Sequence, residues 1–177
     1  CIMCVENKKE VTKMKDKAKL LRNELKALGL TSQDVSVRVK PCTYSERMDV
    51  IIKNLSIDIK EIERLARKYE KVDRDEITGE ILAGGNDYVY VAYDWEVLKK
   101  EGENFLPLAE KILNTNMGEV IAKTGEYRLY YFADVVPYLF VEGGSERRKL
   151  PAGDKWQLAE SLAKCHYLYG FNFDEEV

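Results

Sequence analysis

The sequence predicts an α+β fold in which antiparallel sheets pack against helices. Three observations lead to this prediction. Apolar residues recur at helical spacing near both ends of the chain, short runs between them alternate apolar and polar residues, and glycine or proline separates these segments. The chain has 177 residues, 45% of them hydrophobic, and can bury about 70% of its unfolded surface, enough for one compact domain or two small ones. The elements are expected in the order α-β-β-α-β-β-α-α-β-β-β-α.

An amphipathic helix is expected over residues 10–28, with Gly29 placed to end it. Residues 34–40 then alternate valine with polar residues, the pattern of a strand with one solvent-facing side, and Pro41 is expected to stop that strand. Residues 47–55 are expected to form its antiparallel partner. The helix is predicted from apolar residues that recur every three or four positions, namely Val11, Met14, Ala18, Leu21, Leu25 and Leu28.

A second helix is expected over residues 56–72, where Asp58 and Glu61 have capping-box spacing. The glycine pair that follows, in Gly84-Gly85-Asn86-Asp87, raises the question of a phosphate-binding loop. Such a loop opens a helix, whereas here the alternating run "YVYVAYD" follows directly and several acidic residues lie nearby. The four residues are therefore interpreted as the loop of a second hairpin within residues 78–94.

The second half predicts two short helices broken near Gly102, three strands within residues 118–144, and a closing helix that begins near Asp154. The first two of these strands are expected to join at residues 123–126. Pro137 indicates that the third is an edge strand or is bulged. The expected domains are residues 8–95 and 96–177.

The formal charge of −3 conceals an asymmetry. Residues 1–71 hold 17 basic against 11 acidic residues, a net of +6, and residues 72–177 hold 11 against 20, a net of −9. This division is compatible with a basic face for nucleic acid, an acidic face for a basic protein, or two sets of charges that attract each other within the fold.

The first half carries a resemblance to a known family. Five segments carry it, namely "DKAKLLRNELK", "DVSVRVK", "YSERMDVII", "IKEIERLARKYEKVD" and "DEITGEILAGGNDYVYVAYD". In that order they resemble the large polyvalent protein-associated domain numbered twenty-nine in its series, found in polyproteins and small proteins of phages and conjugative elements. The resemblance covers roughly residues 10–95, and its most specific part is "TGEILAGGN". It implies a mobile-element context in a bacterial cell and antagonism of host defence, and it carries over no catalytic residue.

No catalytic or cofactor motif stands out, so neither enzymatic activity nor a cofactor is expected. The sole histidine, His166, adjoins Cys165, but neighbouring helical side chains point about 100° apart and do not make a ready nucleophile–base pair. A partnership of His166 with Cys42 stays open. Cys1 and Cys4 form a C-x-x-C without a closely spaced second ligand pair, so no structural zinc site is expected.

The leading hypothesis is a non-catalytic protein-binding factor of a phage or mobile element, an inhibitor of a host CRISPR or restriction effector. Tyrosine beside acidic residues is the composition of a protein-binding face, and such a face suits a basic, nucleic-acid-handling host protein. The expected contact residues are Tyr88, Tyr90, Asp87, Asp94 and Glu96.

The alternative is a nucleic-acid-binding accessory module in the basic first half, with Lys13, Lys17 and Arg22 as contacts. Under the leading hypothesis these three side chains face water. No apolar run approaches the roughly 20 residues of a membrane span, and no signal-peptide pattern is present, so a cytoplasmic protein without a membrane partner is expected.

Overall fold

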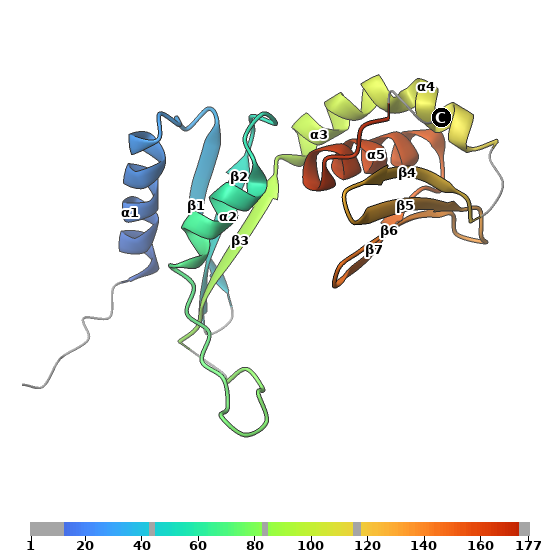
Figure 1. Ribbon diagram of the computed structural model, residues 1–177. Helices are drawn as coiled ribbons and strands as arrows, with labels where there is room; N and C mark the ends of the chain where they lie inside the picture. The colour runs from blue at the N-terminus through green and yellow to red at the C-terminus, as the bar shows by residue number, and fades with distance from the viewer. Residues whose placement is uncertain (1–12, 43–44, 83–84, 115–117, 174–177) are drawn as a thin grey trace, which may run out of the picture. The chain divides into compact units, whose positions relative to one another are not determined.

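The computed structural model describes residues 13–42, 45–82, 85–114 and 118–173, and it has the predicted α+β class. The chain divides into two compact units, Cys1–Ala92 (unit 1) and Tyr93–Val177 (unit 2). The sequence analysis places this boundary after residue 95. Each unit holds one sheet and its own helices (Figure 1).

Unit 1 places two helices on one face of a three-stranded sheet, in the order β1-β2-β3. The predicted first hairpin is confirmed, since β1 and β2 pair antiparallel from Val35 opposite Ile52 to Cys42 opposite Ser45. Asp58 caps α2 by accepting a hydrogen bond from the Lys60 amide. The elements are α1 (Met14–Ala27), β1 (Val35–Cys42), β2 (Ser45–Ile52), α2 (Ile59–Arg67) and β3 (Asp87–Tyr93).

The core of unit 1 follows the predicted periodicities. One face of α1 and the alternate residues of β1, β2 and β3 are buried together, so the polar residues of each strand point to the opposite face of the sheet. The buried set includes Met14, Ala18, Leu21, Leu25, Val35, Val37, Met48, Val50, Ile52, Ile62, Val89 and Val91.

The prediction that Pro41 stops the first strand is wrong, because β1 continues through Pro41 to Cys42. β1 is an edge strand, and only one side of an edge strand needs its amides for the ladder. A proline whose missing N–H lies on the free side breaks no ladder bond.

The predicted second hairpin within residues 78–94 is also wrong. Its first half contributes only an isolated bridge, Arg74 to Ile81, and β3 pairs instead with β2. The Glu46 amide donates to the Asn86 carbonyl at 3.3 Å, so β3 starts beside the start of β2. The two strands therefore run in the same direction, and this sheet is mixed.

Asn86 explains why the chain makes this loop. Its side chain is buried, accepts from the Asp73 amide at 2.8 Å and donates to the Leu82 carbonyl at 2.7 Å. These bonds tie the loop to itself and leave β3 free to join β2. Gly85 has a φ of 70°, as expected for a glycine in this segment, whereas Gly84 lies outside the described residues.

Unit 2 stacks three helices on one face of a four-stranded antiparallel meander, β4-β5-β6-β7 (Figure 1). Its core joins α4 and α5 to the alternate residues of the strands. Asp154 caps α5, and Gly170 ends it at a φ of 73°. The elements are α3 (Trp95–Gly102), a 3₁₀ turn (Glu103–Phe105), α4 (Leu106–Ile112), β4 (Val120–Thr124), β5 (Tyr127–Phe132), β6 (Tyr138–Gly143), β7 (Glu146–Pro151) and α5 (Lys155–Tyr169).

Two expectations for this sheet are corrected. The sequence predicts three strands, but Glu146–Pro151 adds a fourth, which the pattern does not reveal because only Leu150 in it is buried. This edge strand makes β6 central, so the expectation that Pro137 marks an edge or a bulge is wrong. Pro137 precedes β6, and its carbonyl accepts from the Ala152 amide at 3.0 Å.

A hydrogen bond between α1 and the end of α2 predicts a step in alkaline stability. Tyr69 Oη donates to Glu24 Oε1 at 2.8 Å, and burial together with the nearby carboxylate raises the pKa of Tyr69 to about 12. The folded state keeps this proton between pH 10 and 12 while the unfolded tyrosine loses it. The stabilisation is therefore complete below pH 10 and declines as the pH rises to 12.

The test compares urea midpoints of the native protein and Tyr69→Phe across this range. The unfolding free energy of the native protein minus that of Tyr69→Phe is expected to stay constant below pH 10 and to decrease between pH 10 and 12. A difference that stays constant up to pH 12 would contradict the assignment.

Candidate functional site

The predicted contact residues Asp87 and Lys17, assigned to opposing hypotheses, pair with each other. Lys17 Nζ lies 2.6 Å from Asp87 Oδ2 and 3.1 Å from the Tyr69 carbonyl oxygen, and the side chains of Lys17 and Asp87 are only 16% and 20% exposed. The expectation that Lys17 faces water is wrong. This pair is an example of the attraction within the fold that the charge asymmetry allows.

The other predicted acidic residues lie in unit 2. Asp94 caps α3 by accepting from the amides of Glu96 and Val97, at 3.0 and 3.4 Å, so its carboxylate has a structural task. Glu96 is exposed in the first turn of that helix.

Tyr90 alternates with the buried Val89 and Val91 and is exposed, whereas Tyr88 lines a pocket with Arg67 and Glu70 at the end of α2. Tyr90 is 51% exposed, and the guanidinium carbon of Arg47 lies 5.6 Å from its ring centroid. Arg47 and Lys40 both pair with the buried Asp49, at 2.6 and 2.7 Å. Burial opposes ionisation of Asp49, but these hydrogen bonds prevail and lower its pKa. The groups nearest the exposed tyrosine are therefore mainly cationic.

The basic residues of the alternative hypothesis are also partly used by the fold. Arg22 is exposed, as expected, but its Nη2 also donates to the Val37 carbonyl at 2.7 Å. Lys13 is exposed where α1 begins. The three side chains do not form one cationic patch.

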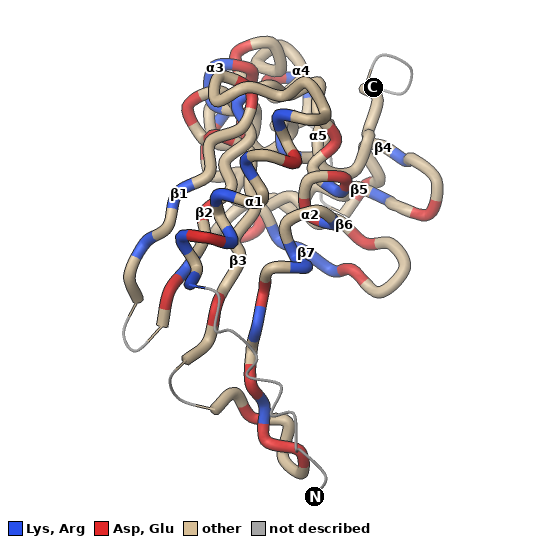
Figure 2. The backbone as a smooth tube through the Cα atoms, turned by 90° about the vertical axis from the view of Figure 1, so that its left-hand side faces the viewer, with Lys and Arg blue, Asp and Glu red and all other residues tan. Residues whose placement is uncertain are grey.

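Division by structural unit weakens the charge asymmetry. The acidic segment between α2 and β3 belongs to unit 1, which holds 18 basic and 16 acidic residues, a net of +2. Unit 2 holds 10 and 15, a net of −5. Basic and acidic residues alternate along the chain in both units (Figure 2).

His166 and Cys165 have structural surroundings in unit 2. His166 Nδ1 lies 2.7 Å from the Phe171 carbonyl, and its ring packs against Phe105 and Tyr167. Cys165 is fully buried, which raises the pKa of its thiol, while Cys42 is exposed in unit 1. Among the described residues no three His, Cys, Asp or Glu side chains gather as metal ligands. Cys1 and Cys4 lie outside the described residues.

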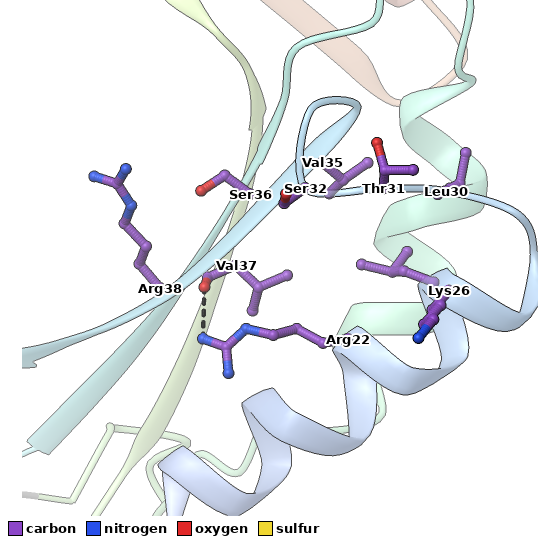
Figure 3. Close-up of a pocket in the computed structure, with 10 residues that line it drawn as sticks. Arg22, Lys26, Leu30, Thr31, Ser32, Val35, Ser36, Val37 and Arg38 are labelled. Atoms are coloured by element: carbon purple, nitrogen blue, oxygen red, sulfur yellow. Dashed lines mark hydrogen bonds between the residues drawn. The ribbon is translucent and has the colours of Figure 1, made fainter.

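A groove that the sequence analysis does not predict lies between α1 and β1 (Figure 3). It encloses about 410 Å³. Its apolar floor includes the buried residues Leu25, Val35 and Val37. The other lining residues are Arg22, Lys26, Leu30, Thr31, Ser32, Ser36 and Arg38.

The backbone of β1 faces this groove with its free edge. Asp34 O accepts from the Lys53 amide at 2.7 Å, so the even-numbered residues of β1 point their backbone groups toward β2. The odd-numbered residues point theirs away, as the bond from Arg22 to the Val37 carbonyl confirms. The amides of Val37 and Val39 therefore lie on the free edge, with no hydrogen bond to another described residue.

Three cations surround this edge. Arg22 and Lys26 project from α1, and Arg38 projects from β1 on the other side of the strand (Figure 3). Among the described residues no carboxylate forms an ion pair with any of them. The groove thus combines free backbone donors, an apolar floor and unneutralised positive charge.

The comparisons with known proteins add no assignment to this geometry. No family model, curated protein or solved structure matches the chain. None of the helices in the described segments is long and apolar enough to cross a membrane.

Proposed function

We propose that the protein is a non-catalytic protein-binding factor, and that unit 1 receives an extended acidic segment of its partner as an added strand on β1. The observation that carries this proposal is the free edge of β1 beside a groove lined by cations. Strand addition obtains affinity from main-chain hydrogen bonds and specificity from side-chain pockets. In β1 the Val37 and Val39 amides can make the main-chain hydrogen bonds, and the groove can receive the side chains.

The lining defines the chemistry of the added strand. Alternate side chains of an extended peptide point to opposite sides, so one set can lie over Leu25 and Val37 while carboxylates meet the cations. Arg22 and Lys26 flank one side of the strand and Arg38 the other. A segment that alternates apolar and acidic residues fits this arrangement.

The biological context of the proposal comes from the family resemblance. The matching segments include α1, β1 and β2, and so every element that lines the groove. We take the partner to be a host bacterial protein in the cytoplasm, a CRISPR or restriction effector that a mobile element inhibits. The contact on that partner is then an acidic extended segment.

The nucleic-acid alternative for unit 1 has less support. Of its three contact residues, Lys17 is neutralised by Asp87, whereas Lys13 and Arg22 are exposed, and Arg22 also donates to the Val37 carbonyl. The exposed cations of α1 could meet a phosphate backbone, but that contact would leave the apolar floor of the groove and the free amides of β1 without a partner.

The test measures binding of a labelled peptide of about eight residues, in which valine alternates with glutamate, by fluorescence anisotropy. The full chain is expected to bind this peptide and not a counterpart with lysine in place of glutamate. Removing three cations in Arg22→Gln/Lys26→Gln/Arg38→Gln is expected to weaken binding about tenfold or more. The amide resonances of Val37 and Val39 are expected to shift on peptide binding.

The matched control is Lys13→Gln/Lys60→Gln/Arg64→Gln, which removes the same charge from exposed positions at the start of α1 and on α2, none of which lines the groove. This variant is expected to bind the peptide within about twofold of the native protein, since exposed charges far from a contact are largely screened. Equal binding of both peptides, or equal losses in the two triple variants, would overturn the proposal.

A further inference from the structure

One face of the sheet in unit 2 is left without a helix. Leu129 and Tyr131 of β5 point into the core beneath α4 and α5, and so do Leu139 and Val141 of β6. α3, α4 and α5 all lie on that same side of the sheet (Figure 1). The alternate residues of the two central strands point the other way.

Those alternate residues form a continuous aromatic surface. Phe132 of β5 and Tyr138 of β6 stack with centroids 5.1 Å apart, and Tyr130 and Phe140 lie 6.3 Å apart in the adjacent row. All four side chains are half-buried. Aromatic rings that only fill a core are covered, whereas these four are partly exposed on one face of the sheet. Such a face offers a contact surface for a planar ligand.

Cations border these rings. The strand register aligns Lys123, Arg128, Glu142 and Arg147 in one row across the sheet, and it sets Lys149 beside Phe140 in the next. Lys149 Nζ lies 4.2 Å from the Tyr138 ring centroid. Glu142 pairs with Arg147 at 3.5 Å, while Lys123 and Arg128 have no ion pair within the described residues. The face therefore has a net positive charge in a unit whose net charge is negative.

A hollow of about 470 Å³ adjoins the aromatic surface at the loop between β5 and β6. Val135 and Val136 there are 96% and 74% exposed. Tyr138 and Lys149 complete one wall. Apolar side chains held in water beside a cation and a ring are ready to cover a planar, negatively charged ligand.

We infer that this face binds single-stranded nucleic acid, with bases on the aromatic rings and phosphates on the bordering cations. Stacking platforms with basic margins are how proteins hold unpaired strands, since every base offers a ring face. Of the carboxylates near this face, Glu142 pairs with Arg147 and Asp134 lines the hollow. Four other acidic residues of the unit lie on the helices, on the covered side of the sheet. These residues are Glu96, Glu101, Glu110 and Glu160.

This inference does not depend on the peptide groove, which lies in unit 1. An acidic protein surface would also satisfy the cations, but it would leave the four rings without stacking partners. The experiment therefore separates stacking from charge.

The test titrates the full chain with a fluorescein-labelled oligothymidylate of about twelve nucleotides, a length within the site sizes of single-strand binders. Tyr138→Leu/Phe140→Leu keeps apolar side chains in the sheet and is expected to weaken binding about tenfold or more, because each stacked base contributes about 1–3 kcal/mol. Arg128→Gln/Lys149→Gln is expected to lower the slope of log Kd against log salt by about 1.4.

The control Lys99→Gln/Lys100→Gln removes two charges from α3, on the covered side of the sheet, and is expected to leave binding unchanged. A blunt duplex of the same length is expected to bind about tenfold more weakly, since its bases are not free to stack. Native affinity in the leucine variant would overturn the inference. So would equal affinity for the duplex, or equally effective competition by polyglutamate of the same charge, which would indicate an acidic protein instead.

Discussion

Replacing Gly143 with alanine is expected to destabilise unit 2 by about 3 kcal/mol, because the new methyl group has no space. A Cβ at this position would clash with Tyr127 Cδ1 and would lie 2.8 Å from Tyr127 Cα and 3.0 Å from the Glu126 carbonyl oxygen. Two of these contacts are with backbone atoms, which cannot move aside as a side-chain tip can. The Tyr127 ring also packs on Tyr169 at 5.3 Å, so its displacement disturbs the contact between β5 and α5.

Tryptophan fluorescence can follow this loss in the full chain, since both tryptophans, Trp95 and Trp156, belong to unit 2. Gly125→Ala is the matched control, because Gly125 has a φ of 54° and its added Cβ would meet nothing within 4 Å. That variant bears backbone strain without a clash and is expected to cost about 1 kcal/mol. Equal urea midpoints for the two variants would show that the clash at Gly143 is relieved at little cost.

Reversing the charge of Lys17 in Lys17→Glu is expected to destabilise unit 1 by about 2 kcal/mol. The substitution sets two carboxylates against each other where Lys17 and Asp87 now lie 2.6 Å apart, and it removes the donor to the Tyr69 carbonyl. Unit 1 has no tryptophan, so hydrogen exchange of the Leu21 and Leu25 amides in α1 is the appropriate measurement.

The exchanged pair Lys17→Glu/Asp87→Lys provides the control for this prediction. It restores opposite charges across the contact but not the bond to the Tyr69 carbonyl, so about half of the lost stability is expected to return. If Lys17→Glu alone left the exchange rates unchanged, the pair would contribute nothing to the fold.

The periodic segments of the chain were predictable because local pattern determines them. α1 and the β1–β2 hairpin follow from apolar spacing, and the start of α2 from the cap at Asp58. β7 was not predictable, since a charged edge strand with one buried residue has no alternating signal. The pairing of β3 follows a loop held by Asn86, whose side chain joins Leu82, four residues away, to Asp73, thirteen residues away.

The candidate sites were less predictable than the fold. Composition located tyrosines and charges in the chain but not their neighbours in space, and so it placed Lys17 and Asp87 in competing surfaces although they neutralise each other. The groove beside β1 exists because α1 lies next to the free edge of that strand. No pattern in the sequence predicts this arrangement. The aromatic face of unit 2 required the register of β5 and β6, which brings Tyr130 opposite Phe140 and Phe132 opposite Tyr138.

The connection order of unit 2 also sets the order in which its core can be completed during synthesis. β4 to β7 are successive neighbours, so the meander can form as it is made, yet α5 supplies Leu158, Leu162 and Cys165 to the core only afterwards. At a synthesis rate of about 5–20 residues per second, α5 is completed on the order of seconds after β7. During that interval only α4 is available to cover the apolar side, and the nascent chain is at its most prone to pair with the wrong surface.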